Sequence, residues 1–383
     1  MTPQLHLEHV VREQRIIICC GSGGVGKTTT AAALGVLAAR QGRSALVMTV
    51  DPAHRLAQAM GLDSLSHEPE SVVLDAPGAL AAMMLDTKHT FDRLVAQHAP
   101  TSEVREAIFA NEYYRQLSSS LGGSRELVAM ERVLEAVIEE AYDLLIVDTP
   151  PAHHALDFLN APGRLIDLID GSLTSMLIKP YEVAARAQFG LFRQSSALTL
   201  KFMERLSGFE MLADLSDFLL AFSSMFDGFK ERSHRVMELM RDPSTTFLLI
   251  CAPEQSSLQQ VDQFRARLRA EAMHITGVLV NRVHVCDLGA GNLDKTALDA
   301  LSSVLGERSD GVPLSDRVIE AYAEHRMLGA ADAQAMQGLF AEDLPVRTVP
   351  HFRRDLASMF DLEAFAELLG QEQVAVDFSR DQP

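Results

Sequence analysis

The chain has 383 residues, and its 34 Lys and Arg against 52 Asp and Glu give a formal net charge of −18. Hydrophobic residues make up 47% and charged residues 22%, as is typical of globular proteins, which argues against wholesale disorder. The acidic balance argues against nucleic acid or an anionic membrane surface as the main partner, because both attract clustered Lys and Arg.

Seven short apolar runs are predicted as strands, in chain order at residues 16–20, 45–50, 80–85, 144–147, 247–251, 275–280 and 346–349. Each has strand length, several end in a polar or glycine-rich turn, and helical patterns separate them. This alternation predicts an α/β fold, with a doubly wound, mostly parallel sheet covered by helices on both faces.

Two stretches break the alternation of strands and helices. Residues 87–141 and 161–241 have helical periodicity without a convincing strand, and the second stretch is rich in Leu, Phe and Met. These Met and Phe residues fit either an ordinary core or a flexible apolar groove for a hydrophobic client. We interpret both stretches as a helical subdomain inserted into an α/β core formed by residues 1–86, 142–160 and 242–373, with a tail at 374–383.

The strongest motif directly follows the first predicted strand. It is Gly21-Ser22-Gly23-Gly24-Val25-Gly26-Lys27-Thr28, which matches G-x-x-x-x-G-K-[ST] and runs through Thr29 into an Ala-rich helical pattern. Glycines let backbone N–H groups wrap phosphates, Lys27 would reach the terminal phosphates, and Thr28 would ligate magnesium. The strand–loop–helix context therefore predicts a nucleotide-binding phosphate loop.

Two acidic residues at the ends of predicted strands complete this pattern. Asp148 ends the apolar run at 144–147, the Walker B arrangement, and would hold magnesium through a water. Asp51 follows the run at 45–50 and begins Asp51-Pro52-Ala53-His54.

Together these segments resemble the ArsA-type anion-transporting ATPases, which include the arsenite-pump ATPase and the eukaryotic ATPase that delivers tail-anchored proteins to the endoplasmic reticulum. The resemblance also covers the segment after Asp148, Thr-Pro-Pro-Ala-His-His, and extends over most of the chain through residues 84–88, 123–131, 252–254 and 280–282. It implies a P-loop NTPase core of the deviant Walker A class that binds ATP and Mg²⁺.

The resemblance also implies a role for each matching residue. Lys27 and Asp51 are the expected catalytic residues, since Asp51 matches the aspartate that orients or deprotonates the attacking water. Thr28, Asp51 and Asp148 form the expected metal set. Asn281 matches the asparagine that reads adenine, and Pro350 lies where the family closes over the base.

Two positions depart from the family pattern. Ser22 stands where the family usually has a signature lysine that crosses the dimer to the partner's nucleotide. In the region of the C-x-x-C pair that shares zinc in the targeting ATPase, this chain has only His284-Val285-Cys286. Since one Cys286 per chain cannot supply four thiolates to a dimer, no zinc is expected. The other cysteines lie in predicted strands, so arsenite is the least supported substrate.

The sequence also carries expectations about location. Four cysteines in so long a chain do not form a disulfide framework, which indicates a reducing compartment. The first 15 residues have no apolar signal region, and no apolar run approaches the roughly 20 residues that span a bilayer. A cytoplasmic protein is expected.

The main functional hypothesis is a Mg-dependent ATPase whose hydrolysis cycle opens and closes a dimer and so controls a partner, client or transport component. One alternative is a chaperone or targeting factor that binds hydrophobic segments, with ATP timing their release. Another is a partition-type positioning ATPase, which the acidic charge and the missing lysine weaken. Because each chain has one phosphate loop, we expect a homodimer or a heterodimer with a paralogue. The other expected partners are a hydrophobic protein client or a membrane transport component, and not nucleic acid.

Overall fold

The computed structural model describes residues 3–50, 55–112, 114–115, 124–139, 141–149, 225–285, 314–340, 344–352, 356 and 358–372. The strands are β1 (Ile16–Gly21), β2 (Ser44–Thr49), β3 (Glu70–Ser71), β4 (Ala79–Met84), β5 (Leu144–Asp148), β6 (Thr245–Cys251), β7 (Ile275–Val283) and β8 (Val346–Pro350). The helices are α1 (Leu7–Glu13), α2 (Lys27–Arg40), α3 (Arg55–Ala59), α4 (Thr87–His98), α5 (Ser102–Ala110), α7 (Ser124–Glu139), α12 (Phe226–Arg241), α13 (Gln255–Ala270), α15 (Leu314–Phe340) and α16 (Met359–Gly370).

The strands form one sheet in the order β3-β4-β2-β5-β1-β6-β7-β8, parallel throughout except for β3. All seven predicted strands are present, which confirms the doubly wound α/β fold. Only the two-residue β3 was missed, and it is too short to leave a periodic pattern. Because later strands add on both sides of β1, the carboxyl end of β1 is the switch point at which such sheets bind ligands.

The register of the central strands brings particular residues into line. Asp148, the last residue of β5, pairs with Cys19 of β1 on one side and with Thr49 of β2 on the other. Side chains at paired positions of neighbouring strands point to the same face of a sheet. The register therefore places Thr49 beside the Asp148 carboxylate.

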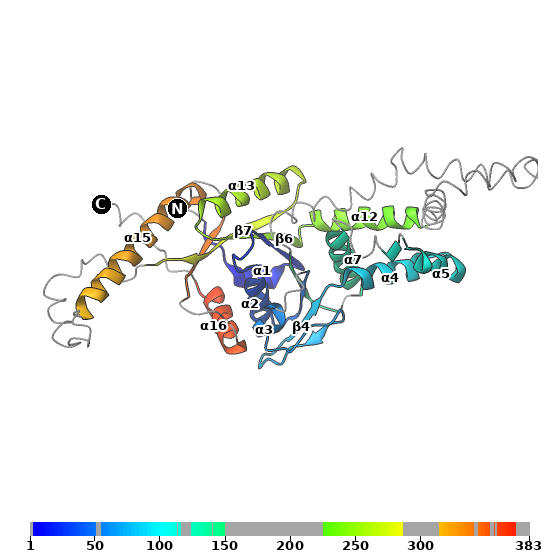
Figure 1. Cartoon of the computed structure of the whole chain (residues 1–383), viewed down its shortest axis with the longest axis horizontal. Coiled ribbons are helices and arrows are strands. Elements are labelled where there is room, and N and C mark those ends of the chain that lie inside the picture. The colour runs from blue at the N-terminus through cyan, green and yellow to red at the C-terminus, as the bar shows by residue number, and fades with distance from the viewer. Residues whose placement is uncertain are drawn as a thin grey trace, which may run out of the picture.

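Helices cover both faces of the sheet, as Figure 1 shows. On one face α2 packs against β2 and β5 and is flanked by α1, α3 and α16. On the other face α13 and α12 contact β6, and α7 contacts α12. Alternate residues of β1 consequently enter two separate cores: Ile16, Ile18 and Cys20 face α7, α12 and α13, whereas Ile17 and Cys19 face α2.

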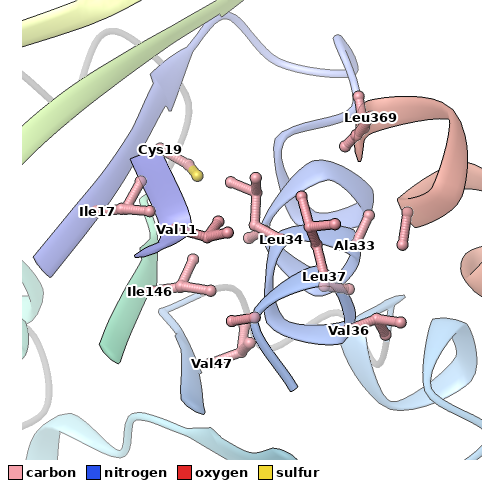
Figure 2. Packing of buried hydrophobic residues seen from close by; sticks show 14 of the residues in the cluster. Val11, Ile17, Cys19, Ala33, Leu34, Val36, Leu37, Val47, Ile146 and Leu369 are labelled. Atoms are coloured by element: carbon pink, nitrogen blue, oxygen red, sulfur yellow. The ribbon is translucent and has the colours of Figure 1, made fainter. Parts of the chain in front are cut away.

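The α2 side of the core is packed closely because α2 is rich in alanine. Figure 2 shows the side chains of Ile17, Val47 and Ile146 directed from the sheet toward Leu34 of α2. Every residue of α2 from 30 to 39 is buried. A helix that is apolar on all sides belongs inside a protein, and here it lies between the sheet and α16.

Charged side chains join α4, α7 and α12. Arg93 of α4 and Arg132 of α7 both contact the Glu135 carboxylate, at 3.3 and 3.0 Å, and Arg232 of α12 pairs with Glu131. Burial raises the pKa of Glu131, and the Arg232 guanidinium opposes that shift. These ion pairs fix the relative positions of α4, α7 and α12.

The predicted helical subdomain is described only in part. Residues 87–141 contain α4, α5 and α7, and α12 ends the second stretch, while residues 150–224 and the tail lie outside the described residues. Since α7 and α12 also bury side chains against the sheet, the division into core and subdomain stays a prediction. Within the described ranges, no helix is both long and apolar enough to cross a bilayer.

Candidate functional site

The phosphate loop lies between the carboxyl end of β1 and the first residue of α2, as its motif predicts. Gly21 ends β1, and a Cβ there would overlap the Ile250 carbonyl of β6. Gly26 has φ +95°, which strains other residues, and a Cβ there would overlap the Asn281 amide nitrogen. Ser22, Gly23, Gly24 and Val25 complete the loop between them. Both glycines are therefore required by close approach of the backbone to neighbouring strands.

Lys27 begins α2 and is 7% exposed. Its Nζ donates to the Ser22 carbonyl oxygen at 2.9 Å, so the ammonium lies across the loop that would receive phosphates. The Ser22 hydroxyl and the Ser257 hydroxyl of α13 lie 2.8 Å apart, and Ser257 Oγ also accepts from the Ala252 N–H. Ser22 is thus joined to its own chain at the position where the family usually has the signature lysine.

Two of the three predicted magnesium ligands, Thr28 and Asp148, contact each other next to Lys27. Thr28 Oγ1 donates to Asp148 Oδ2 at 2.7 Å, and Thr49 Oγ1 donates to the same oxygen at 2.9 Å. Asp148 is 1% exposed. A hydroxyl and a carboxylate are the hard oxygen donors that Mg²⁺ prefers, so the residues present fit this ion. When bound, Mg²⁺ supplies positive charge that stabilises charge developing on phosphate oxygens.

The chain leaves the sheet beside this site at two further points. Thr149 follows Asp148, and its hydroxyl donates to the Cys19 carbonyl at 2.7 Å, which attaches the first residue of the Thr-Pro-Pro-Ala-His-His segment to β1. Val50 donates its N–H to the Asp148 carbonyl at 3.4 Å. Asp51 itself lies outside the described residues, so its predicted roles in catalysis and metal binding stay predictions. Thr29 lies half-buried in the first turn of α2.

Asn281 connects β7 to the phosphate loop. Its Nδ2 donates to the Val25 carbonyl at 2.8 Å, and its Oδ1 accepts the Arg282 N–H at 2.9 Å. A primary amide has two donor hydrogens and two acceptor lone pairs, so one of each remains for a ligand. Asn281 can therefore hold the loop and still present a donor and an acceptor to a base.

The pairing of β7 with β8 is irregular next to Asn281. Pairing between β7 and β8 shifts between Val280 and Val283, and Arg282 has φ +62°. After the shift, Val283 pairs with Pro350, the predicted base-closing residue that ends β8. The site therefore has Asn281 and Pro350 on neighbouring strands, at the same end of the sheet as the phosphate loop.

His284, in the segment that stands where the family has its C-x-x-C zinc pair, contacts other residues of the protein. His284 Nδ1 lies 2.9 Å from Asp332 Oδ2 of α15, and the His284 ring stacks on His351 with centroids 5.0 Å apart. Cys286 lies outside the described residues.

The three described cysteines have the properties of core residues. Cys19, Cys20 and Cys251 are at most 1% exposed. Burial raises the pKa of Cys20 and of Cys251 to about 12 and raises that of Cys19 as well. Because a thiolate is the metal ligand, protonated buried thiols are poor ligands for arsenite or zinc.

Sequence reasoning missed two hydroxyl residues that organise the site, Thr49 and Ser257. Thr49 left only a weak signal: it is a hydroxyl residue near the end of the predicted strand that leads to Asp51, and its position beside Asp148 depends on a strand order that the sequence did not predict. Ser257 left no such signal, because its role depends on how α13 approaches the loop.

Comparison with known proteins agrees with this geometry. The family model described as anion-transporting ATPase matches residues 14–288. An ATPase ASNA1 homolog of Babesia bovis is 25% identical over 357 residues, covering 92% of this chain and 89% of that protein. An ATPase get3 of Neurospora crassa is 27% identical over 283 residues, covering 74% of this chain and 77% of that protein. With the phosphate loop, the Thr28–Asp148 pair and a family match across most of its length, the chain belongs to the anion-transporting ATPases and is an ATP-hydrolysing enzyme.

Proposed function

We propose that this chain uses Mg-dependent ATP hydrolysis to time the binding and release of a hydrophobic protein segment. The observation that carries the nucleotide part is the 2.7 Å contact between Thr28 and Asp148, next to the buried Lys27. Lys27 would meet the terminal phosphates, Thr28 and Asp148 would hold the ion, and Asp51 would handle the attacking water. Asn281 and Pro350 would receive the adenine.

The choice of a hydrophobic client over a transported anion rests on two observations. Both relatives described above, from Babesia bovis and Neurospora crassa, are eukaryotic, and the eukaryotic branch of the family delivers tail-anchored proteins. The described cysteines are buried and protonated, so they do not offer the clustered thiolates that arsenite needs. The Phe- and Met-rich sequence of residues 161–241 supplies the adaptable apolar side chains that a client would need.

A nucleotide-trapped variant tests this proposal. Asp51→Asn should bind ATP yet turn it over slower by orders of magnitude, because the phosphate loop is intact while the group acting on water is lost. We expect a labelled apolar helical peptide to bind Asp51→Asn with ATP differently from the same variant with ADP. Lys27→Ala, which loses the phosphate contact, is the control that should show no nucleotide dependence. Equal peptide affinity in both nucleotide states of Asp51→Asn would contradict client timing.

We also propose that the active form is a dimer of two such chains or of this chain with a paralogue. Ser22 contacts Ser257 of its own chain and cannot supply the charge that a signature lysine brings across a dimer. Slow turnover by the chain alone is therefore expected, and Ser22→Lys should accelerate it. ATPase rate measured against protein concentration tests the dimer. A rate per chain that stays constant down to concentrations where light scattering finds only monomer would contradict it.

A further inference from the structure

Two histidines and a glutamate outside the nucleotide site lie together near the end of β4. One ligand atom from each of His67, Glu68 and His89 lies within 4.8 Å of the other two. Ligands of a tetrahedral zinc ion lie about 3.3 Å apart, given bonds of about 2.0–2.1 Å. The side chains of His67 and Glu68 are exposed and that of His89 is half-buried, so rotation of the two exposed side chains can bring the three atoms around one ion.

The backbone holds the two sides of this cluster in place. His67 and Glu68 lie in the loop before β3, where the Ser66 carbonyl accepts the N–H of Met84, the last residue of β4. His89 lies at the start of α4, and its N–H donates to the Asp86 carboxylate at 2.7 Å. Because both supports are at the end of β4, the three side chains are held near one another before any ion binds.

Among the described residues, nothing contacts the ring nitrogens of His67 and His89 through a hydrogen bond, so they are available to an ion. The centroids of the two imidazole rings are 3.8 Å apart. Within the described ranges no ring nitrogen of either histidine takes part in a hydrogen bond, and the bond from His89 to Asp86 is made by the backbone N–H. Neutral imidazole nitrogens are lone-pair donors, and two of them with one carboxylate match the donor set of many zinc sites. The cluster therefore has the chemistry of a transition-metal site rather than that of an oxygen-only magnesium site.

Two arginines surround the third ligand. Glu68 Oε1 lies 3.6 Å from Arg93 and Glu68 Oε2 lies 3.7 Å from Arg132, both longer than a hydrogen bond. Glu68 is 57% exposed, so these contacts leave its oxygens accessible. Polar groups around a ligating carboxylate commonly orient it, and Arg93 and Arg132 are placed to do so.

We propose that His67, Glu68 and His89 form a binding site for a divalent transition-metal ion of the zinc class, with water completing its coordination. Such an ion ties the loop after α3 to the start of α4, and through Arg93 and Arg132 to α7. The expectation that no zinc binds was based on thiolates, and this site uses none. The site also needs no second chain, so it binds one ion per chain.

A Zn²⁺ titration tests the site. The full-length chain carries Cys286→Ser, and the buffer contains excess Mg²⁺ so that the magnesium site does not take up Zn²⁺. We expect one Zn²⁺ per chain, and His67→Ala or His89→Ala each to raise the dissociation constant by at least about 100-fold, given the 10–100-fold that supporting groups alone contribute. His9→Ala is the matched control, because His9 pairs with Glu13 at 2.9 Å in an exposed two-residue pair. His284→Ala controls for the histidine beside Cys286. Neither control should change the affinity.

Two results of the Zn²⁺ titration would overturn the proposal. One is a Zn²⁺ affinity that is the same in wild type, His67→Ala and His89→Ala; the other is loss of binding in His284→Ala with retention in His67→Ala. If a histidine variant does not fold, judged by far-UV circular dichroism, Glu68→Gln replaces it. Co²⁺ bound to wild type should then show the visible absorption of a four-coordinate site, and Glu68→Gln should lose or shift it. An unchanged spectrum would also refute the assignment.

Discussion

Thr49→Val tests whether the site is organised around the Asp148 carboxylate. The change keeps the shape of the side chain but removes the hydroxyl that donates to Asp148 Oδ2 at 2.9 Å. Thr49 and Asp148 are 2% and 1% exposed, so water cannot easily replace the lost donor. A hydrogen bond to a charged group contributes about 1.5–3 kcal/mol, and we expect the free energy of unfolding to fall by about 2 kcal/mol.

The chain offers a matched control for this substitution. Thr245 begins β6, is fully buried, and its hydroxyl has no hydrogen-bond partner within the described part of the chain. Thr245→Val removes a buried hydroxyl of the same size without breaking a hydrogen bond. It should therefore leave the free energy of unfolding unchanged or raise it.

Two measurements compare the variants. Urea unfolding followed by circular dichroism gives the difference in stability between Thr49→Val and Thr245→Val, provided that the slopes agree. The Mg²⁺ concentration that half-saturates ATPase activity should rise about 10-fold or more in Thr49→Val alone, because groups that orient metal ligands contribute about that much. Equal destabilisation by both substitutions, or a Thr49→Val protein with wild-type stability and Mg²⁺ dependence, would refute this account of the site.

Three further predictions follow from the described contacts. Lys27→Ala should abolish or severely weaken ATP hydrolysis in a phosphate-release assay, and near-normal turnover would contradict the phosphate-loop interpretation. Gly26→Ala should weaken nucleotide binding at least about 10-fold by calorimetry, because the new Cβ displaces Asn281 and the positive φ strains the backbone. Gly42→Ala is the control: Gly42 also has a positive φ, +83°, but lies in open space, so this change should leave nucleotide affinity unchanged. Burial raises the pKa of Cys20 and Cys251 to about 12, so both thiols stay protonated at pH 8 and should resist alkylation until the chain unfolds. Mass spectrometry measures the extent of alkylation, and rapid labelling of either cysteine in the native chain would argue against its burial.

The sequence predicts the sheet well because its strands are buried on both faces and read as continuous apolar runs. The phosphate loop and Asp148 were predictable for a related reason: glycines, a lysine and a strand-ending carboxylate at fixed spacing are required by phosphate and metal chemistry. Thr49 and Ser257 were not predicted, because a hydroxyl acquires its role only from the neighbour that the register brings to it. The register shift beside Arg282 also lay beyond prediction, since nothing in Val-Asn-Arg-Val marks a residue with positive φ.

The contacts that hold the phosphate loop have a consequence for the thermodynamics of nucleotide binding. Ser22 is joined to Ser257 of α13 and Val25 is joined to Asn281 of β7, so both ends of the loop are attached to other parts of the chain. Ordering a free backbone costs about 1–2 kcal/mol per residue, and a loop already ordered avoids much of that cost when phosphates arrive. The nucleotide therefore meets a preorganised cradle, and its affinity depends on charge and hydrogen bonding with little loss of loop entropy.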